Sequence, residues 1–129
     1  MIGKRGGKQT ISIGPNCTLG NAIHEIGHAI GLYHEQSRND RDSFVIIKWQ
    51  NIIANNRHNF NQYLNAGFDI GAYDYCSIMH YPRKAFSSNG QDTVIPRRSS
   101  AECMGQRNGL SKLDVEAMRT MYPSIGSMA

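Results

Sequence analysis

Apolar side chains recur at helical spacing in residues 19–32. Four of them fall on one face of a 3.6-residue repeat: Ala22, Ile23, Ile26 and Ile30. Thr18, directly before the run, is one of the residue types that accept hydrogen bonds from the free N–H groups at a helix start. The pattern predicts a helix from residue 19 to about residue 32, with the four apolar side chains facing the core.

A second helix is predicted near the end of the chain. Ser111 and Asp114 have the spacing of a capping box, in which each side chain accepts from the other residue's backbone N–H. The helix would reach about residue 121 with four apolar side chains on one face: Leu113, Ala117, Met118 and Met121. Pro123 has no N–H to donate, so we expect it to end the helix.

The residues between these helices show weaker patterns. Residues 44–49 are a short apolar run that predicts an extended or irregular segment, followed by a short helix at about residues 50–54. Residues 51–65 are rich in asparagine and are expected to form a surface loop, which makes His58 a surface histidine. No internal repeat or second domain is indicated.

Three histidines, a glutamate and a glycine lie in and just after the first predicted helix. His24 and His28 are four residues apart, so both imidazoles can reach one metal ion from the same helix face. Glu25 is one step around the helix, where it can hold a metal-bound water without being a ligand. Gly31 accepts the left-handed backbone that ends a helix, which turns the chain and allows His34 to supply a third imidazole.

This motif is specific because it fixes five positions within eleven residues, including the glycine that the geometry requires. Three neutral imidazoles leave a position open for water, which is the ligand number of catalytic rather than structural zinc. The alternative interpretation is a helix whose histidines are merely solvated or packed. The spacing favours the catalytic zinc site.

Three blocks of sequence resemble the astacin family of zinc metalloendopeptidases, in the metzincin clan. They are the histidine motif with its extension to residue 42, the segment 73–81 with its Met-turn, and the segment 105–114. The blocks run in the family's order and cover nearly the whole chain. The resemblance implies an α+β fold, a truncated metzincin (zincin-like) catalytic domain. It would contain the end of the N-terminal sheet, the zinc-binding helix, and a loop-rich C-terminal subdomain with the Met-turn and a C-terminal helix.

The resemblance also implies roles for individual residues. One Zn²⁺ per chain would be bound by three ligands, His24, His28 and His34. Glu25 would be the catalytic general base that activates the zinc-bound water. Met79 would form the hydrophobic floor beneath the metal. Tyr81 would be an additional zinc ligand in the resting enzyme and a catalytic hydrogen-bond donor afterwards, although taken alone it would more often be a half-buried aromatic side chain.

The extent of the domain follows from the same resemblance. Residues 1–129 would be an incomplete peptidase domain, in which residues 1–34 end the N-terminal lobe and carry the zinc helix, and residues 35–129 form the C-terminal subdomain. Residues 1–3 would be the tail of an edge strand and residues 9–13 a second strand. We expect a fragment that is poorly stable alone, because these strands lack their sheet. Gly31 and Glu35 are assigned structural roles, and Glu35 contacts the new N-terminus of activated enzymes in the family.

The three cysteines are an odd number, which in a secreted protein predicts a missing partner or a free thiol. By family resemblance, the partner of Cys17 would lie in the absent lobe. Cys76 and Cys103 flank the Met-turn and the loop after it, and they are expected to form a disulfide. A zinc role for the cysteines is disfavoured because the sequence has no Cys-x-x-Cys pair.

The composition changes this interpretation little. The 129 residues carry a mild net charge of +4, with no stretch long enough for a membrane span and no signal peptide. Nucleic-acid binding is disfavoured because no binding motif is present. Arg97, Arg98 or Arg107 is a candidate for a pocket that prefers acidic side chains just past the scissile bond, as in some relatives.

The expected function is zinc-dependent endopeptidase activity on extracellular proteins or peptides, with a secreted location implied by the family. The alternative is an inactive zinc-binding fragment or decoy that lacks the upper wall of the substrate cleft.

Overall fold

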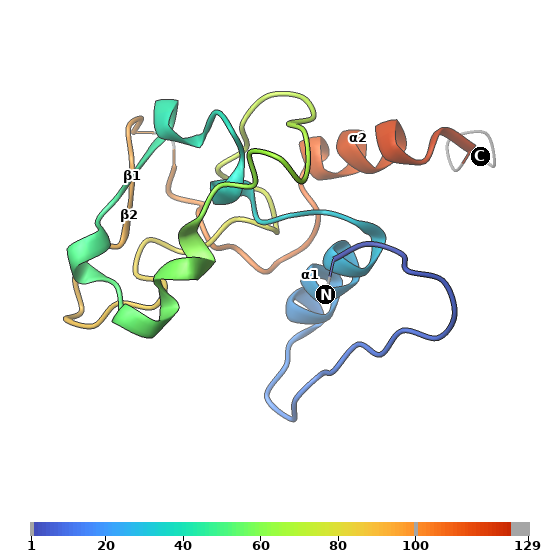
Figure 1. Cartoon of the computed structure of the whole chain (residues 1–129), viewed down its shortest axis with the longest axis horizontal. Coiled ribbons are helices and arrows are strands. Elements are labelled where there is room, and N and C mark those ends of the chain that lie inside the picture. The colour runs from blue at the N-terminus through green and yellow to red at the C-terminus, as the bar shows by residue number, and fades with distance from the viewer. Residues whose placement is uncertain (1, 100, 125–129) are drawn as a thin grey trace.

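A computed structural model describes residues 2–99 and 101–124 of the chain. Its two α-helices are α1 (Leu19–Ile30) and α2 (Lys112–Met121), and its two strands are β1 (Val45–Ile47) and β2 (Val94–Pro96). Figure 1 shows α1 below the looped middle of the chain, with the strands and α2 at opposite ends. Short 3-10 helices connect these elements, at Glu35–Ser37, Arg41–Ser43, Trp49–Asn51 and Ala54–Phe60. The mixed architecture confirms the expected α+β class.

Both ends of α1 have local causes that the sequence carries. The Thr18 hydroxyl accepts a hydrogen bond from the backbone N–H of Asn21 at 3.3 Å, which satisfies a donor of the first turn. Gly31 has a φ of 114°, and its N–H donates to His28 O at 3.1 Å. The helix therefore ends at Ile30, two residues before the expected end, because the left-handed glycine breaks the helical path there.

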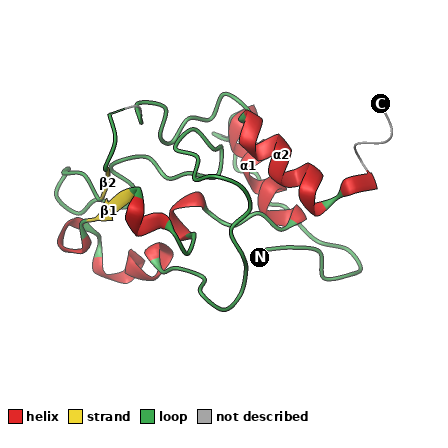
Figure 2. Ribbon diagram, turned by 90° about the horizontal axis from the view of Figure 1, so that it is seen from above, coloured by secondary structure: helices red, strands yellow, loops and turns green. Residues whose placement is uncertain are grey.

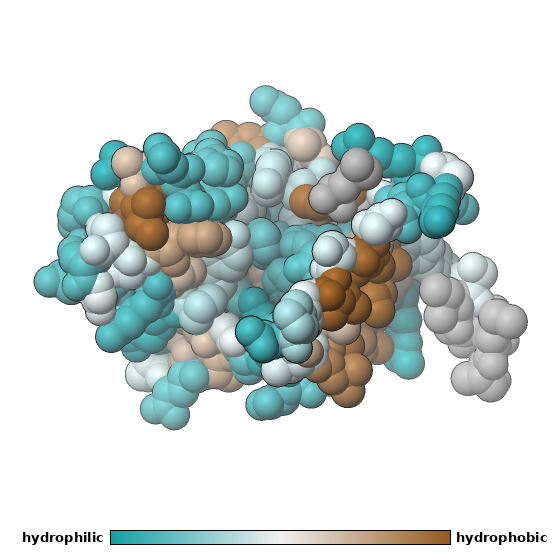
Figure 3. Space-filling model, turned by 90° about the horizontal axis from the view of Figure 1, so that it is seen from below, coloured by the Kyte–Doolittle hydropathy of each residue, from teal (hydrophilic) through white to brown (hydrophobic). Residues whose placement is uncertain are grey.

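The buried face of α1 differs from the expected one. The buried residues of α1 are Gly20, His24 and Gly27. Ile26 is 48% exposed and Leu19 is 77% exposed, so the predicted inward orientation of Ile26 is wrong. The glycines Gly20 and Gly27 are buried because the rest of the chain approaches them closely. Figure 3 shows hydrophobic side chains gathered on the surface of this side of the molecule.

The main core lies around the two strands. Val45 pairs with Pro96 and Ile47 with Val94 in the antiparallel register of β1 and β2. The side chains of Val45, Val94 and Phe60 are fully buried in one hydrophobic cluster. The pairing of β1 with β2 was not predicted, because the two strands lie about fifty residues apart in the sequence.

The asparagine-rich segment is more ordered than the expected surface loop. A 3-10 helix occupies Ala54–Phe60, and Phe60 at its end is fully buried. The short helix expected at residues 50–54 is instead a 3-10 turn at Trp49–Asn51, after which Ile52 forms a β-bridge with Ser87. Individual buried apolar residues anchor this segment to the core. They are not evident from a composition dominated by asparagine.

The N-terminal segment contains no strand within its described residues, so the strand expected at residues 9–13 is wrong here. Ile11 and Ile13 are 40% and 52% exposed. A strand needs a neighbour for its N–H and C=O groups, and no such neighbour is available to this segment in the described chain. Figure 1 shows the segment as a wide loop beside α1, and Figure 2 shows the same loop from above. Met1, part of the expected edge strand, lies outside the described residues.

No helix in the described part of the chain is long and apolar enough to cross a membrane.

Candidate metal centre

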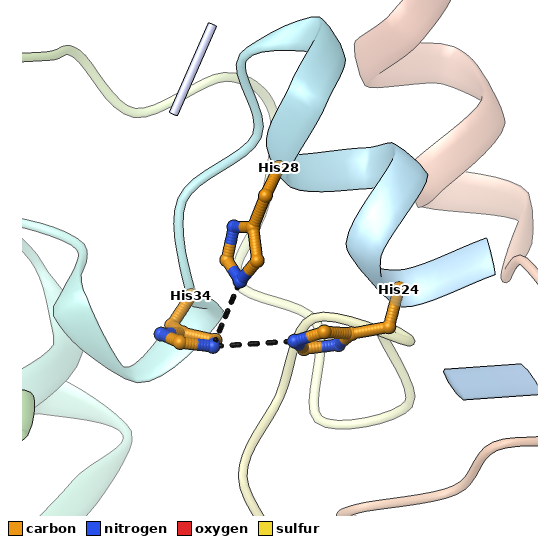
Figure 4. A group of neighbouring side chains, drawn as sticks. All are labelled: His24, His28 and His34. Carbon is orange, nitrogen blue, oxygen red and sulfur yellow. Dashed lines mark hydrogen bonds between the residues drawn. The ribbon is translucent and has the colours of Figure 1, made fainter. Parts of the chain in front are cut away.

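Three imidazoles converge beside the end of α1. His24 and His28 come from successive turns of the helix, and His34 comes from the segment that Gly31 turns back toward it. Nε2 of His34 lies 3.1 Å from Nε2 of His28 and 3.3 Å from Nε2 of His24. Figure 4 shows the three rings directed toward one another. The structure thus brings together the three histidines that the sequence motif singled out.

Backbone carbonyls fix the orientation of two of these rings. His24 Nδ1 lies 2.7 Å from Ile78 O, and His28 Nδ1 lies 2.8 Å from Leu32 O. A carbonyl oxygen only accepts, so each Nδ1 carries a proton, and in the neutral imidazole Nε2 then keeps its lone pair. Metal-binding histidines are held by such second hydrogen bonds.

The donor set fits a tetrahedral zinc ion. Zinc–nitrogen bonds of about 2.0–2.1 Å place neighbouring ligand atoms of a tetrahedron about 3.3 Å apart, close to the two separations measured from His34 Nε2. Burial and, less strongly, repulsion from His28 and His24 lower the pKa of His34 to about 2. Burial also lowers the pKa of His24. Neutral imidazoles with lone pairs facing one point are what a divalent cation requires.

Met79 packs directly against the helix that carries the histidines. Its side chain is 2% exposed, and a Cβ at Gly27 would lie only 2.7 Å from the Met79 sulfur. Gly27 is therefore needed for this close approach. A buried methionine here supports the expected hydrophobic floor, although the role itself stays a prediction.

Tyr81 lies beside the third histidine. Its ring centroid is 4.4 Å from that of His34, and its backbone N–H donates to Gln36 Oε1 at 3.2 Å. Burial raises the pKa of Tyr81 to about 12, so the hydroxyl keeps its proton at neutral pH. The phenol is thus a hydrogen-bond donor next to the histidine cluster.

Glu25 and Arg107 add opposite charges to the site. Glu25 is exposed on α1 between the ligand-spaced histidines. Arg107 Nη1 donates to His80 O at 3.3 Å, and burial lowers its pKa while the nearby Glu25 carboxylate opposes that shift. A Cβ at Gly20 would lie 1.6 Å from Arg107 O, so glycine allows α1 to dock on the loop that carries Arg107.

The other two candidate arginines lie elsewhere. Arg97 Nε donates to Asp42 O at 2.8 Å, and the Arg98 guanidinium lies 5.6 Å from the centre of the Phe44 ring. Both are therefore engaged at the residues preceding β1. Arg107 is the candidate that contacts the Met-turn.

Glu35 links the segment after α1 to the segment that contains the Met-turn. Its Oε1 accepts from the Asp74 N–H at 2.8 Å and lies 3.4 Å from Arg38 Nη1, while its own N–H donates to Met79 O. Burial raises the pKa of Glu35 to about 7, and the Asp74 N–H and Arg38 only partly oppose this. These contacts support a structural role in the described chain.

The sequence analysis did not predict that Asp114 also binds the segment that orients His24. Asp114 and Ser111 form the predicted capping box of α2. The same carboxylate also accepts from Ser77 Oγ at 2.6 Å and from the Ile78 N–H at 2.9 Å, and Ile78 O in turn orients His24. The capping pattern identified Asp114 as a local feature, and nothing in the spacing pointed to this long-range contact.

The expected disulfide between Cys76 and Cys103 is present, with a Cα–Cα distance of 5.1 Å. Gln106 Nε2 donates to Cys76 O at 2.8 Å and reinforces the same junction. Cys17 has a free thiol among the described residues.

The remaining histidines lie outside the cluster. His80 is fully buried between Tyr73 Oη and Tyr81 O, each 2.7 Å away, and burial lowers its pKa to about 4. His58 is exposed, as predicted.

Comparison with known proteins gives a consistent picture. The sequence profile of the astacin peptidase family matches residues 1–123. Zinc metalloproteinase nas-15 of Caenorhabditis elegans is 49% identical over 95% of this chain and 22% of its own length. High choriolytic enzyme 1 of the medaka Oryzias latipes is 42% identical over 94% of this chain and 46% of its own, and the human meprin A subunit beta is 39% identical over 98% and 18%.

The solved structure of high choriolytic enzyme 1, a hatching-enzyme zinc protease, superposes with a TM-score of 0.74 at 43% identity. The match covers 81% of this chain and 52% of that one. The fold and the histidine motif thus define a metzincin-type metallopeptidase domain. The chain belongs to the astacin family, whose members are zinc-dependent peptidases, and it spans about half of that solved relative.

Proposed function

We propose that this chain carries the catalytic zinc site of an endopeptidase that hydrolyses peptide bonds of extracellular proteins. The observation that carries the proposal is the convergence of the His24 and His28 imidazole nitrogens within 3.3 Å of His34 Nε2, beside a helix with an exposed glutamate. His24, His28 and His34 hold one zinc ion per chain. Bound there, zinc supplies a Lewis acid that polarises the scissile carbonyl and lowers the pKa of a coordinated water to about 7.

Glu25 acts as the general base. It takes the proton from the attacking water while the oxygen bonds to the carbonyl carbon, and it then gives this proton to the leaving nitrogen as the C–N bond breaks. Its position one residue after His24 and near Arg107 supports this role. No covalent bond to the enzyme is needed.

Tyr81 donates a hydrogen bond to the carbonyl oxygen as negative charge develops there. Its protonated phenol supports the assignment, and the closeness of its ring to His34 supports Tyr81 as an additional zinc ligand in the resting state. Loss of one such donor typically costs about 100- to 1,000-fold in rate.

Arg107 favours acidic side chains just past the scissile bond. Its guanidinium is the candidate that contacts the Met-turn, and Glu25 is the carboxylate that partly offsets its charge. An acidic substrate side chain would gain from this cation in a partly buried setting.

An oxidising, extracellular location is supported by the Cys76–Cys103 disulfide. Such bonds persist in secreted proteins and are rare in the reducing cytosol.

The central test compares the unmodified chain with Glu25→Gln and with Glu116→Gln, a matched change at an exposed glutamate of α2. We expect one zinc per chain by elemental analysis in all three, with cleavage of a casein or quenched-peptide substrate abolished only by Glu25→Gln. Full activity of Glu25→Gln would refute the assigned base. Equimolar zinc without any cleavage by the unmodified chain would instead identify an inactive zinc-binding product.

Two further variants test the substrate contacts. Tyr81→Phe should leave weak activity with zinc retained, and unchanged activity would remove Tyr81 from the mechanism. Arg107→Ala should reduce the preference for acidic residues in a peptide-library digest, and a library profile without acidic preference in the unmodified chain would dismiss that assignment.

A further inference from the structure

Asn16 stands in an Asn-Cys-Thr triplet directly before α1. Of the eleven asparagines in the sequence, Asn16 is the only one followed by a non-proline residue and then by serine or threonine. This triplet is the acceptor pattern for asparagine-linked glycans in secreted proteins, and it requires an accessible surface segment. The triplet alone is common, so its position in the fold carries the argument.

The local structure leaves the acceptor open. The Cys17 N–H donates to Gly14 O at 3.0 Å, which closes a tight turn with Pro15 and Asn16 at its corner. Gly14, Pro15 and Asn16 are all exposed. Proline at the second position of a turn has its φ already set, so Asn16 is held at the corner. A bulky group on its side chain displaces no packed residue.

We propose that Asn16 is an N-glycosylation site. The inference rests on the extracellular location proposed above, because the modifying enzyme acts in the secretory pathway of animal cells, and the relatives are animal proteins. Asn16 Nδ2 bonds to the anomeric carbon of an oligosaccharide carried on a lipid pyrophosphate. The bond from that carbon to the pyrophosphate oxygen breaks, the lipid pyrophosphate leaves, and the amide nitrogen loses one proton.

The glycan would cover apolar surface without reaching the histidines. Side chains near Asn16 in sequence are exposed and apolar, with Ile13 at 52% and Leu19 at 77%. A hydrated glycan beside them masks surface that would otherwise promote association. His24 lies six residues into the helix from Thr18, about 9 Å along the axis. Figure 1 shows the segment before α1 reaching away from the rest of the chain.

Thr18 has two separable tasks, which allows a matched design. Its hydroxyl caps α1 by accepting from the Asn21 N–H, and it also completes the acceptor triplet. Thr18→Asp preserves a good N-cap and destroys the triplet, whereas Thr18→Ser preserves both. Asn16→Gln removes the acceptor and leaves the cap untouched.

The experiment directs the full chain through the secretory pathway of animal cells and analyses the secreted protein. We expect peptide-N-glycosidase to increase the gel mobility of the unmodified chain and of Thr18→Ser, and to convert Asn16 to Asp by mass spectrometry. Thr18→Asp and Asn16→Gln should run at the deglycosylated position, with thermal unfolding no lower than that of the enzymatically deglycosylated protein.

Secreted, disulfide-bonded chain with unmodified Asn16 would overturn the inference and leave the proposed peptidase function standing. A glycosylated chain that binds zinc but cleaves no substrate would support the inference and count against the peptidase function. Retention of the mobility shift in Thr18→Asp would place the glycan elsewhere and refute the assignment to Asn16.

Discussion

Replacing Cys76 and Cys103 together by serine should lower the free energy of unfolding by about 3.5 kcal/mol. The bridge joins residues 27 apart in sequence. In the chain-entropy treatment, closing a loop of this length removes about 12 cal/mol/K from the unfolded chain, which is about 3.5 kcal/mol at 25 °C. For a domain of this size the loss corresponds to a fall in melting temperature of roughly 10–15 °C.

The assay is urea unfolding followed by the fluorescence of Trp49, the only tryptophan of the chain. Trp49 is an informative probe because its ring packs edge-on against Phe60 at 6.3 Å, and Phe60 is fully buried in the core. The slope of the unfolding free energy with urea should increase in the double variant, because its unfolded state exposes more surface.

Cys17→Ser is the matched control, since it makes the same chemical change at a free thiol. It should unfold within about 0.5 kcal/mol of the unmodified chain. Reduced unmodified chain should behave like the double variant. A double variant as stable as Cys17→Ser would refute the reasoning, because the bridge would then contribute nothing through the unfolded state.

Three other predictions concern Gly20, Asp114 and the binding of zinc. Gly20→Ala should destabilise by about 3 kcal/mol or more, because its Cβ would lie 1.6 Å from a backbone oxygen, whereas the Cβ of Gly14→Ala would meet no described atom within 4 Å. Equal midpoints in urea would contradict this. Asp114→Ala should cost about 2–4 kcal/mol by leaving the Ile78 and Ser111 N–H groups without their acceptor, and a loss below about 0.5 kcal/mol in the same assay would count against its anchoring role. Zinc at 100 times its dissociation constant should stabilise the metal-free chain by about 2.7 kcal/mol in thermal unfolding. This gain should vanish in His34→Ala and persist in His58→Ala, and its persistence in both would exclude His34 as a ligand.

Features set by neighbouring residues could be read from the sequence. The spacing of His24 and His28, the left-handed Gly31 and the capping box of α2 each depend on hydrogen bonds or side-chain directions within a few positions. Helix geometry converts such spacings into positions with little freedom, so the convergence of the histidines was predictable. The same holds for the end of α1, which the sequence placed within two residues.

Features that join distant residues depended on the tertiary structure. Periodicity marked Ile26 as inward-facing, but the approach of the Arg107 backbone and of Met79 to Gly20 and Gly27 buried a different face of α1. The apolar run at β1 could not reveal its partner β2. A local pattern indicates which face of an element is more apolar. Only the contacts made by the rest of the chain decide which face is buried.

The position of the charged side chains around the histidines also depended on the tertiary structure. Sequence left three arginines as candidates for the substrate pocket, and the hydrogen bond from Arg107 to His80 O distinguishes it from Arg97 and Arg98. The three histidines thus lie on one short helix and the turn that follows it, whose geometry is local. Met79, the phenol of Tyr81 and the partly buried Arg107 lie fifty to eighty residues further on, and only folding brings such residues within contact distance of α1.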